Sequence, residues 1–335
     1  MQKLFRKTCT WALLASLTLC HWAAPLEAKR AVATAPEAAI NQELLALLPE
    51  SDVVAVIDLP RVFADLLPKL KSISTFGIGN TVGEVETFAK LAGIEPKQIQ
   101  AAALGVKMTE TLSRGSGVLL LQGVEVDAKK MGEAAKASGG ELKTLEHNGK
   151  SFFTLSVKPP NAPADARADE IHFALLDNKR VALGDQAGLK ALLTSGAKKA
   201  DAATLGKALQ ETKTAGLVRF AGNLPEALRT MLASQGELFT QVAAVKLIFG
   251  SFDLNADNTA TLDGRLRTAS ANEAAQLKES LNGLIALGQT FLGGSDDPTM
   301  KLYGQLLNQV KISVQASDVS LLLVVPKELM GGLGK

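Results

Sequence analysis

Two spacings of apolar residues alternate along the chain, and together they predict a mixture of strands and helices. Residues 53–59 (VVAVIDL) are β-branched and nearly all apolar, which is typical of a strand covered on both faces. Pro60 follows, where a helix can begin because its first turn does not need the missing N–H. Residues 62–70 then carry apolar side chains at helical spacing. Further strands are predicted at 99–107 and 117–124, and helices at 82–92 and 128–137.

Short polar turns predict hairpins in the first half of the chain. An Asn-Gly pair between strand-like segments is a strong hairpin signal, and Asn148-Gly149 stands at such a point. Asp177-Asn178 occupies a similar position. The flanking strands are predicted at 141–147, 150–157, 170–176 and 180–184.

The order strand, helix, two strands, helix and hairpin returns in the second half. Its strands are predicted at 216–221, 242–254, 259–267, 310–316 and 319–325. Asn272 is predicted to cap a long helix, with a buried stripe of Leu277, Leu281, Leu284, Ile285 and Leu292. We therefore expect an α+β fold with two similar halves, over residues 43–200 and 213–331. Each half is expected to be a mainly antiparallel sheet with helices packed on one face.

The amino-terminal residues predict export from the cytoplasm. Residues 1–28 have a basic start, a short apolar segment and small residues at the end, which is the pattern of a secretory signal peptide. Residues 29–42 are alanine-rich and predict a flexible tether. Two alternatives place the protein on a membrane, facing outward. The apolar segment 8–26 is nearly long enough to be an uncleaved anchor, and Cys20 has a leucine three residues before it, as lipoprotein signals do. Otherwise the protein is expected to be periplasmic or secreted.

Signal removal changes the composition of the remaining chain. Both cysteines and both tryptophans lie in residues 1–28, so the mature protein has no disulfide, cysteine nucleophile or thiolate metal site. The remaining chain has 33 basic and 33 acidic residues and one tyrosine. Nucleic-acid binding usually requires a basic surface and, for single strands, aromatic side chains, so we expect no nucleic-acid partner.

The opening of the folded region resembles a group of exported bacterial proteins. A signal peptide and an alanine-rich tether are followed by 47–52 (LLPESD), which leads into the strand at 53–59. This order is similar to the start of exported proteins classed as domains of unknown function. The resemblance implies an extracytoplasmic bacterial protein with a duplicated α+β unit, and it implies no activity.

Two groups of polar residues are candidates for a metal site. Asp253, Asn255 and Asp257 have the spacing of a calcium loop, although Asn258 and Gly264 stand where glycine and glutamate are required. The alternative for this segment is a polar hairpin turn. The second group is His147, His172 and Glu170, since two histidines and a carboxylate can bind zinc. No other cofactor is expected.

Two further motifs depart from the patterns that they resemble. Residues 77–83 are glycine-rich like a dinucleotide-binding loop, but valine replaces the third glycine. Ser116 lies between glycines, but not at the spacing of a nucleophile elbow. The sequence therefore favours an exported, non-catalytic binding or scaffold protein of the bacterial envelope, with an unknown envelope protein as partner. One alternative is a carrier of an apolar, lipid-like ligand in a cavity between sheet and helix. Another is a hydrolase that uses Asp or Glu chemistry.

Overall fold

The protein is described by a computed structural model over residues 35–66, 87–108, 115–137, 139–157, 169–212 and 216–330. The chain divides into two compact units. Of the described residues, those from 35 to 107 and from 116 to 202 form the N-terminal unit, and 108, 115 and those from 203 to 330 form the C-terminal unit. Among the described residues, no helix combines the length and apolar character needed to cross a membrane.

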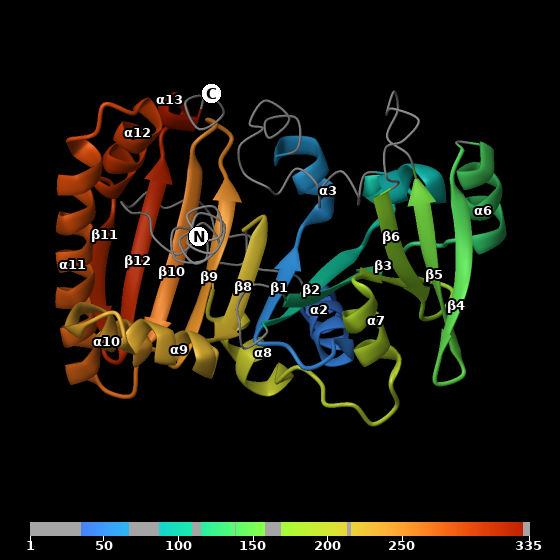
Figure 1. Ribbon diagram of the computed structural model, residues 1–335, viewed down its shortest axis with the longest axis horizontal. Helices are drawn as coiled ribbons and strands as arrows, with labels where there is room; N and C mark the ends of the chain where they lie inside the picture. Colours follow the sequence, from blue (N-terminus) through green and yellow to red (C-terminus); the bar gives the residue numbers. More distant parts are fainter. Residues whose placement is uncertain are drawn as a thin grey trace. The chain divides into compact units, whose positions relative to one another are not determined.

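The N-terminal unit contains an antiparallel sheet with the strand order β1-β2-β3-β7-β6-β5-β4 (Figure 1). Its strands are β1 (Val53–Ile57), β2 (Ala101–Met108), β3 (Gly115–Gln122), β4 (Glu141–His147), β5 (Lys150–Val157), β6 (Asp169–Leu175) and β7 (Arg180–Gly184). Its helices are α2 (Ala35–Leu47), α3 (Leu59–Arg61), the π-helical turn η1 (Val62–Leu66), the 3-10 turn η2 (Pro96–Gln98), α6 (Ala128–Ala137) and α7 (Gln186–Leu193). A further helical segment spans 87–92.

Aromatic side chains form the centre of this unit's core. The Phe173 ring stacks on Phe153 with 5.0 Å between centroids, and it meets Phe88 edge-on at 5.2 Å. Such pairs add about 0.5–1.5 kcal/mol each beyond the burial of their area. Leu44 and Leu48, from α2 and the residues after it, are also completely buried.

The C-terminal unit contains strands in the order β11-β12-β10-β9-β8, and the pairings within it are antiparallel. The strands are β8 (Val218–Asn223), β9 (Leu247–Leu254), β10 (Ala260–Arg267), β11 (Lys311–Gln315) and β12 (Asp318–Val325). The helices are α8 (Ala202–Gln210), which begins at the boundary between units, α9 (Glu226–Ala233), α10 (Glu237–Ala243), α11 (Ala271–Gly293), α12 (Pro298–Leu307) and α13 (Lys327–Met330). The apolar side of α11 packs on β10 and β12 through Ala274, Leu277, Leu281, Leu266, Val319 and Leu321.

The α+β class predicted from the sequence is confirmed. The two strand orders also share a plan. In each unit the first three strands are neighbours in chain order, and the third strand then pairs with the last strand of a later hairpin. The N-terminal unit adds the β4-β5 hairpin to this plan. Descent of both units from one duplicated element, with helices on one face, stays a prediction.

Three local predictions need correction. The tether predicted at 29–42 is helical from Ala35, since α2 continues to Leu47 and is anchored by buried Leu44. Ser270, and not Asn272, is the N-cap of α11: its hydroxyl accepts a hydrogen bond from Glu273 N, while the Glu273 carboxylate accepts one from Ala269 N. The strand predicted at 242–254 begins at 247, because the preceding residues belong to α10.

Candidate functional site

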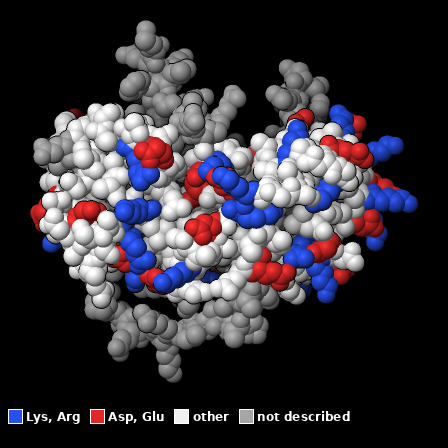
Figure 2. All heavy atoms as spheres, turned by 90° about the horizontal axis from the view of Figure 1, so that it is seen from below, with Lys and Arg blue, Asp and Glu red and all other residues white. Residues whose placement is uncertain are grey.

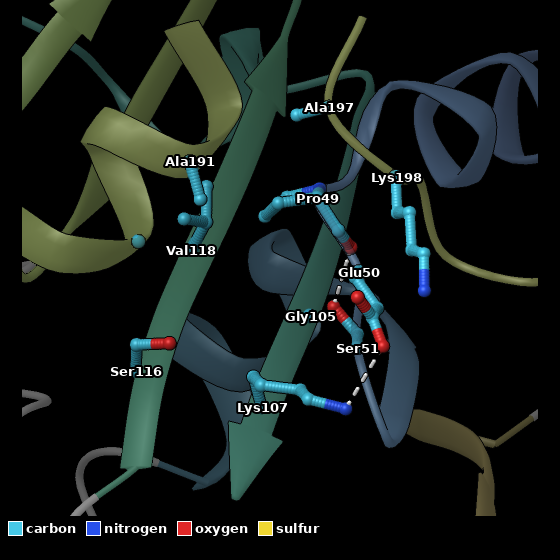
Figure 3. A pocket seen from close by; sticks show the side chains of 11 residues that line it. Pro49, Glu50, Ser51, Gly105, Lys107, Ser116, Val118, Ala191, Ala197 and Lys198 are labelled. Atoms are coloured by element: carbon cyan, nitrogen blue, oxygen red, sulfur yellow. Dashed lines mark hydrogen bonds and ion pairs between the residues drawn. The ribbon is translucent and has the colours of Figure 1, made fainter. Parts of the chain in front are cut away.

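A pocket in the N-terminal unit is the candidate site (Figure 3). Its volume is about 270 Å³. Five parts of the chain line it: the residues after α2, strand β2, strand β3, helix α7, and the segment that follows α7. The lining residues are Pro49, Glu50, Ser51, Gly105, Lys107, Ser116, Val118, Gly188, Ala191, Ala197 and Lys198.

Close approaches at two glycines shape the pocket. A Cβ atom at Gly105 would lie 2.5 Å from Ser51 Oγ, so the segment after α2 reaches the sheet only because this side chain is absent. A Cβ atom at Gly188 would lie 2.8 Å from a methyl group of Val118, so α7 also touches the sheet at a glycine. The space between these two approaches is the pocket.

Charged side chains gather at one end of the pocket. Lys107 Nζ lies 2.9 Å from Asp52 Oδ1 and 3.2 Å from Glu50 Oε1. The hydrogen bond to Asp52 is the main reason why the pKa of Lys107 is raised above its ordinary value of 10.5. Lys107 therefore stays protonated at neutral pH and cannot serve as a general base there.

Ser116 is the second polar group at this end. Figure 3 shows Ser116 and Lys107 at one end of the pocket and Ala191 and Ala197 at the other. Within the described part of the chain, the Ser116 hydroxyl has no hydrogen-bond partner, whereas Ser51 Oγ donates to Pro49 O at 2.8 Å. The arrangement can bind a small molecule by apolar contact and hydrogen bonding.

The histidines proposed for zinc lie at separate places in the N-terminal unit. His147 is paired with Lys150 across β4 and β5, whereas His172 is paired with Thr154 across β5 and β6. Four residues of β5 separate these positions, which corresponds to about 13 Å. His147 Nε2 lies 3.0 Å from Thr194 Oγ1.

Among the described residues, His172 is paired with a threonine. His172 Nδ1 lies 2.9 Å from the hydroxyl of buried Thr154. Glu170, two residues before His172, lies on the same side of β6. It is exposed, and it is paired with Ser156 of β5. No group of three or more potential metal ligands occurs among the residues that the structure describes.

The residues proposed for calcium lie in the turn between β9 and β10. The Asn255 amide donates to Thr259 Oγ1 and to Thr261 Oγ1. Asp257 Oδ1 accepts hydrogen bonds from the backbone and the hydroxyl of Thr259. Asp253 belongs to β9 itself, opposite Thr261 in β10. These side chains therefore stabilise the hairpin turn, which was the alternative prediction for this segment.

The remaining predicted motifs are Ser116, the glycine-rich segment and the signal peptide. Ser116 is part of β3 and not of a strand-to-helix turn, so it does not form a nucleophile elbow. The glycine-rich segment 77–83, Cys20 and the predicted signal peptide lie outside the described residues. Figure 2 shows basic and acidic side chains interspersed on the face in view.

A second feature was not predicted from the sequence. Phe291 and Leu287 of α11 expose 73% and 48% of their surface. We define the α11 surface as these two residues together with exposed Ala286 and Thr290 beside them. Single exposed apolar residues are common, but two large ones on successive turns of a helix indicate a contact surface.

Comparison with known proteins adds a distant structural similarity. No family model matches the chain, and no curated protein matches it. The solved structure of crystal form I of TP0453 is similar at 6% sequence identity and a TM-score of 0.44, over 86% of this chain and 95% of that one. We draw no functional conclusion from a similarity at this level.

Proposed function

We propose that the protein is an exported, non-catalytic scaffold protein of the bacterial envelope that docks onto a second copy of itself through the α11 surface. The exposure of Phe291 carries this proposal, since 73% of this side chain is open to water in an otherwise ordered helix. Covering a phenylalanine or leucine side chain completely is worth about 1.5–3 kcal/mol. The export part of the proposal is supported by the residue pattern of the amino terminus.

The apolar side of α11 is covered along its length within the C-terminal unit. Leu277 and Leu281 face β10 and β12 in the core. Gly288 lies seven residues after Leu281, on the same side of the helix. A Cβ atom at Gly288 would lie 2.7 Å from Leu307, and one at Gly304 would lie 3.3 Å from Gly293 N, so α12 packs closely there. Leu287 and Phe291 lie beside this covered side, and their exposure leaves them available to a partner.

The charges around the α11 surface favour a protein partner over a lipid surface. Residues 280–295 contain no Lys, Arg, Asp or Glu. Helices that lie on membranes usually carry Lys and Arg on their polar face to meet anionic headgroups. Here Lys278 and Glu279 precede the uncharged segment, and Asp296 and Asp297 follow it. The flanks are therefore negative on balance, and such headgroups would repel them.

A second copy suits this surface because its large and small residues are arranged for self-association. A two-fold interface brings the same patch together from both molecules, so the patch must complement itself. Leu287 and Phe291 form one row along α11, and the small residues Ala286 and Thr290 form the neighbouring row. When two α11 helices cross, Phe291 of each copy can lie over the small residues of the other.

Sedimentation velocity over a range of protein concentrations tests the proposal. The wild-type protein should form a dimer, and the double variant Leu287→Ser with Phe291→Ser should dimerise at least about 100-fold more weakly, since both copies lose apolar contacts. Met231→Ser is the matched control, because Met231 is a large exposed residue of the same unit on α9. Its dimerisation should equal that of the wild type.

Three outcomes would overturn the proposal. One is a wild-type monomer at every concentration, and another is a dimer that the double variant leaves intact. The third is binding to phosphatidylglycerol vesicles that the double variant loses, which would assign the surface to a membrane. Export is tested separately by mass spectrometry of the amino terminus, and an intact Met1 on protein from the cytosol would contradict it.

A further inference from the structure

The pocket of the N-terminal unit lies in a different unit from the α11 surface, and it offers a second binding function. We infer that it binds a neutral, mainly apolar small molecule of roughly ten non-hydrogen atoms that carries one hydroxyl or carbonyl group. The size follows from the volume of about 270 Å³, since an apolar cavity of about 150 Å³ accommodates benzene.

The walls select an apolar body. Ala191 and Ala197 present methyl groups to the pocket, and Gly105 and Gly188 present only backbone. Val118 is completely buried behind this wall, with a methyl group against Gly188. The alanines are too small to fill the space between α7 and the strands. A flat or compact apolar group would therefore contact the sheet below it and α7 beside it.

The charges select a neutral ligand. Lys107 and Lys198 contribute two positive charges, and Glu50 and Asp52 contribute two negative charges. Lys107 is already bound to both carboxylates, so an anionic ligand would compete with Glu50 for the ammonium group. A cationic ligand would compete with Lys107 for the same carboxylates. Lys198 is exposed to water, where an ion pair with an anionic ligand is worth little.

Ser116 supplies the specific polar contact. Its hydroxyl lies at the same end of the pocket as Lys107, and it can donate to a carbonyl or exchange hydrogen bonds with a hydroxyl. A ligand with its polar atom at this end would keep its apolar part against Ala191. The volume is too small for a long acyl chain, so the ligand class is narrower than the lipid-like carrier considered from the sequence.

Chemical-shift mapping by NMR tests this inference with defined probes. Benzyl alcohol and toluene should shift the backbone amides of Gly105 and Gly188, whereas benzoate and benzylamine should bind at least about tenfold more weakly. Ala191→Leu fills the pocket and should weaken benzyl alcohol by at least about tenfold. Ala187→Leu is the matched control, because Ala187 is exposed on the same helix outside the pocket.

A second variant keeps the test decisive if Ala191→Leu does not fold. Ser116→Ala should weaken benzyl alcohol several-fold and leave toluene unchanged, because only the alcohol loses a hydrogen bond. The inference is overturned if no probe shifts Gly105 and Gly188, or if benzoate or benzylamine binds as tightly as benzyl alcohol. Equal weakening of both neutral probes by Ser116→Ala would also contradict it.

Discussion

Arg267 connects three parts of the C-terminal unit, and its replacement by methionine should destabilise that unit. From β10, Arg267 donates through Nε and Nη2 to the two carboxylate oxygens of Asp318, each at 2.8 Å. Nη2 also donates to Glu211 Oε2 at 2.6 Å, just beyond the end of α8. The guanidinium lies 4.8 Å from the centre of the Phe249 ring. Methionine keeps the apolar stem and removes all of these polar contacts.

The expected loss in the free energy of unfolding is the sum of the contributions of these contacts. The bidentate contact with Asp318 is the strongest, because its side chain is only 16% exposed, and we assign it about 1–2 kcal/mol. The Glu211 side chain is 30% exposed, and this exposure limits the contribution of its contact to about 0.5 kcal/mol. The cation–π contact adds about 0.5–1 kcal/mol. Arg267→Met should therefore reduce the free energy of unfolding by about 2–3.5 kcal/mol.

Urea unfolding followed by far-ultraviolet circular dichroism measures this change. Tryptophan fluorescence is unsuitable, because both tryptophans lie in the predicted signal peptide. The double-mutant cycle of Arg267→Met and Asp318→Asn should give a coupling energy of about 1 kcal/mol or more.

Arg265→Met is the matched control, because Arg265 is two residues away on β10 and 5.8 Å from the same ring. Within the described part of the chain it has no carboxylate partner, so its loss should be below about 1 kcal/mol. Equal losses for the two arginines, or a coupling energy near zero, would refute the reasoning.

Two further predictions concern single contacts. Gly105→Ala should reduce the free energy of unfolding by about 1–3 kcal/mol, because the new Cβ would lie 2.5 Å from buried Ser51 Oγ. In a Ser51→Ala background the loss should be smaller. Equal losses in the two backgrounds would contradict this prediction. The pKa of Asp257 lies below 3.8 because Thr259 donates two hydrogen bonds to its carboxylate, so Thr259→Val should raise it in a carbon-13 NMR titration. The resulting stabilisation is present at neutral pH and is lost as the pH falls through this lowered pKa, and an unchanged pKa in the variant would refute the assignment.

Local patterns predicted the elements whose formation depends on local chemistry. The Asn148-Gly149 turn adopts positive φ at both residues, 52° and 72°, as a tight hairpin turn requires. In β10, buried and partly exposed residues alternate as the sequence pattern indicates. The start of α2 was missed because alanine, the best helix former, gives no apolar period by which a helix can be recognised. Its register depends instead on the burial of Leu44 and Leu48, which only the folded unit shows.

The pocket could not be predicted, because its residues come from segments that are far apart in the chain. Lys107 meets Asp52 only because β1 and β2 pair with Val53 opposite Val106. Nothing in the local spacing of these residues indicates that pairing register. Ser116 was examined as a nucleophile, but its place in the pocket follows from the packing of α7 against β3.

The exposure of the α11 surface follows from the lengths of the elements that pack together. The 23 residues of α11 extend about 34 Å, whereas the eight residues of β12 extend about 27 Å. Because α11 begins only a few residues after β10 ends, the excess length lies at its carboxyl end, beyond Leu281. There α12 covers one side of the helix through Gly288, and Phe291 remains open although it lies close to the apolar stripe. Periodicity identifies the side of a helix that is apolar, but the length of the sheet decides how much of that side is buried. An uncharged run that continues past the reach of the sheet, as 280–295 does, is therefore the sequence signal for such a surface.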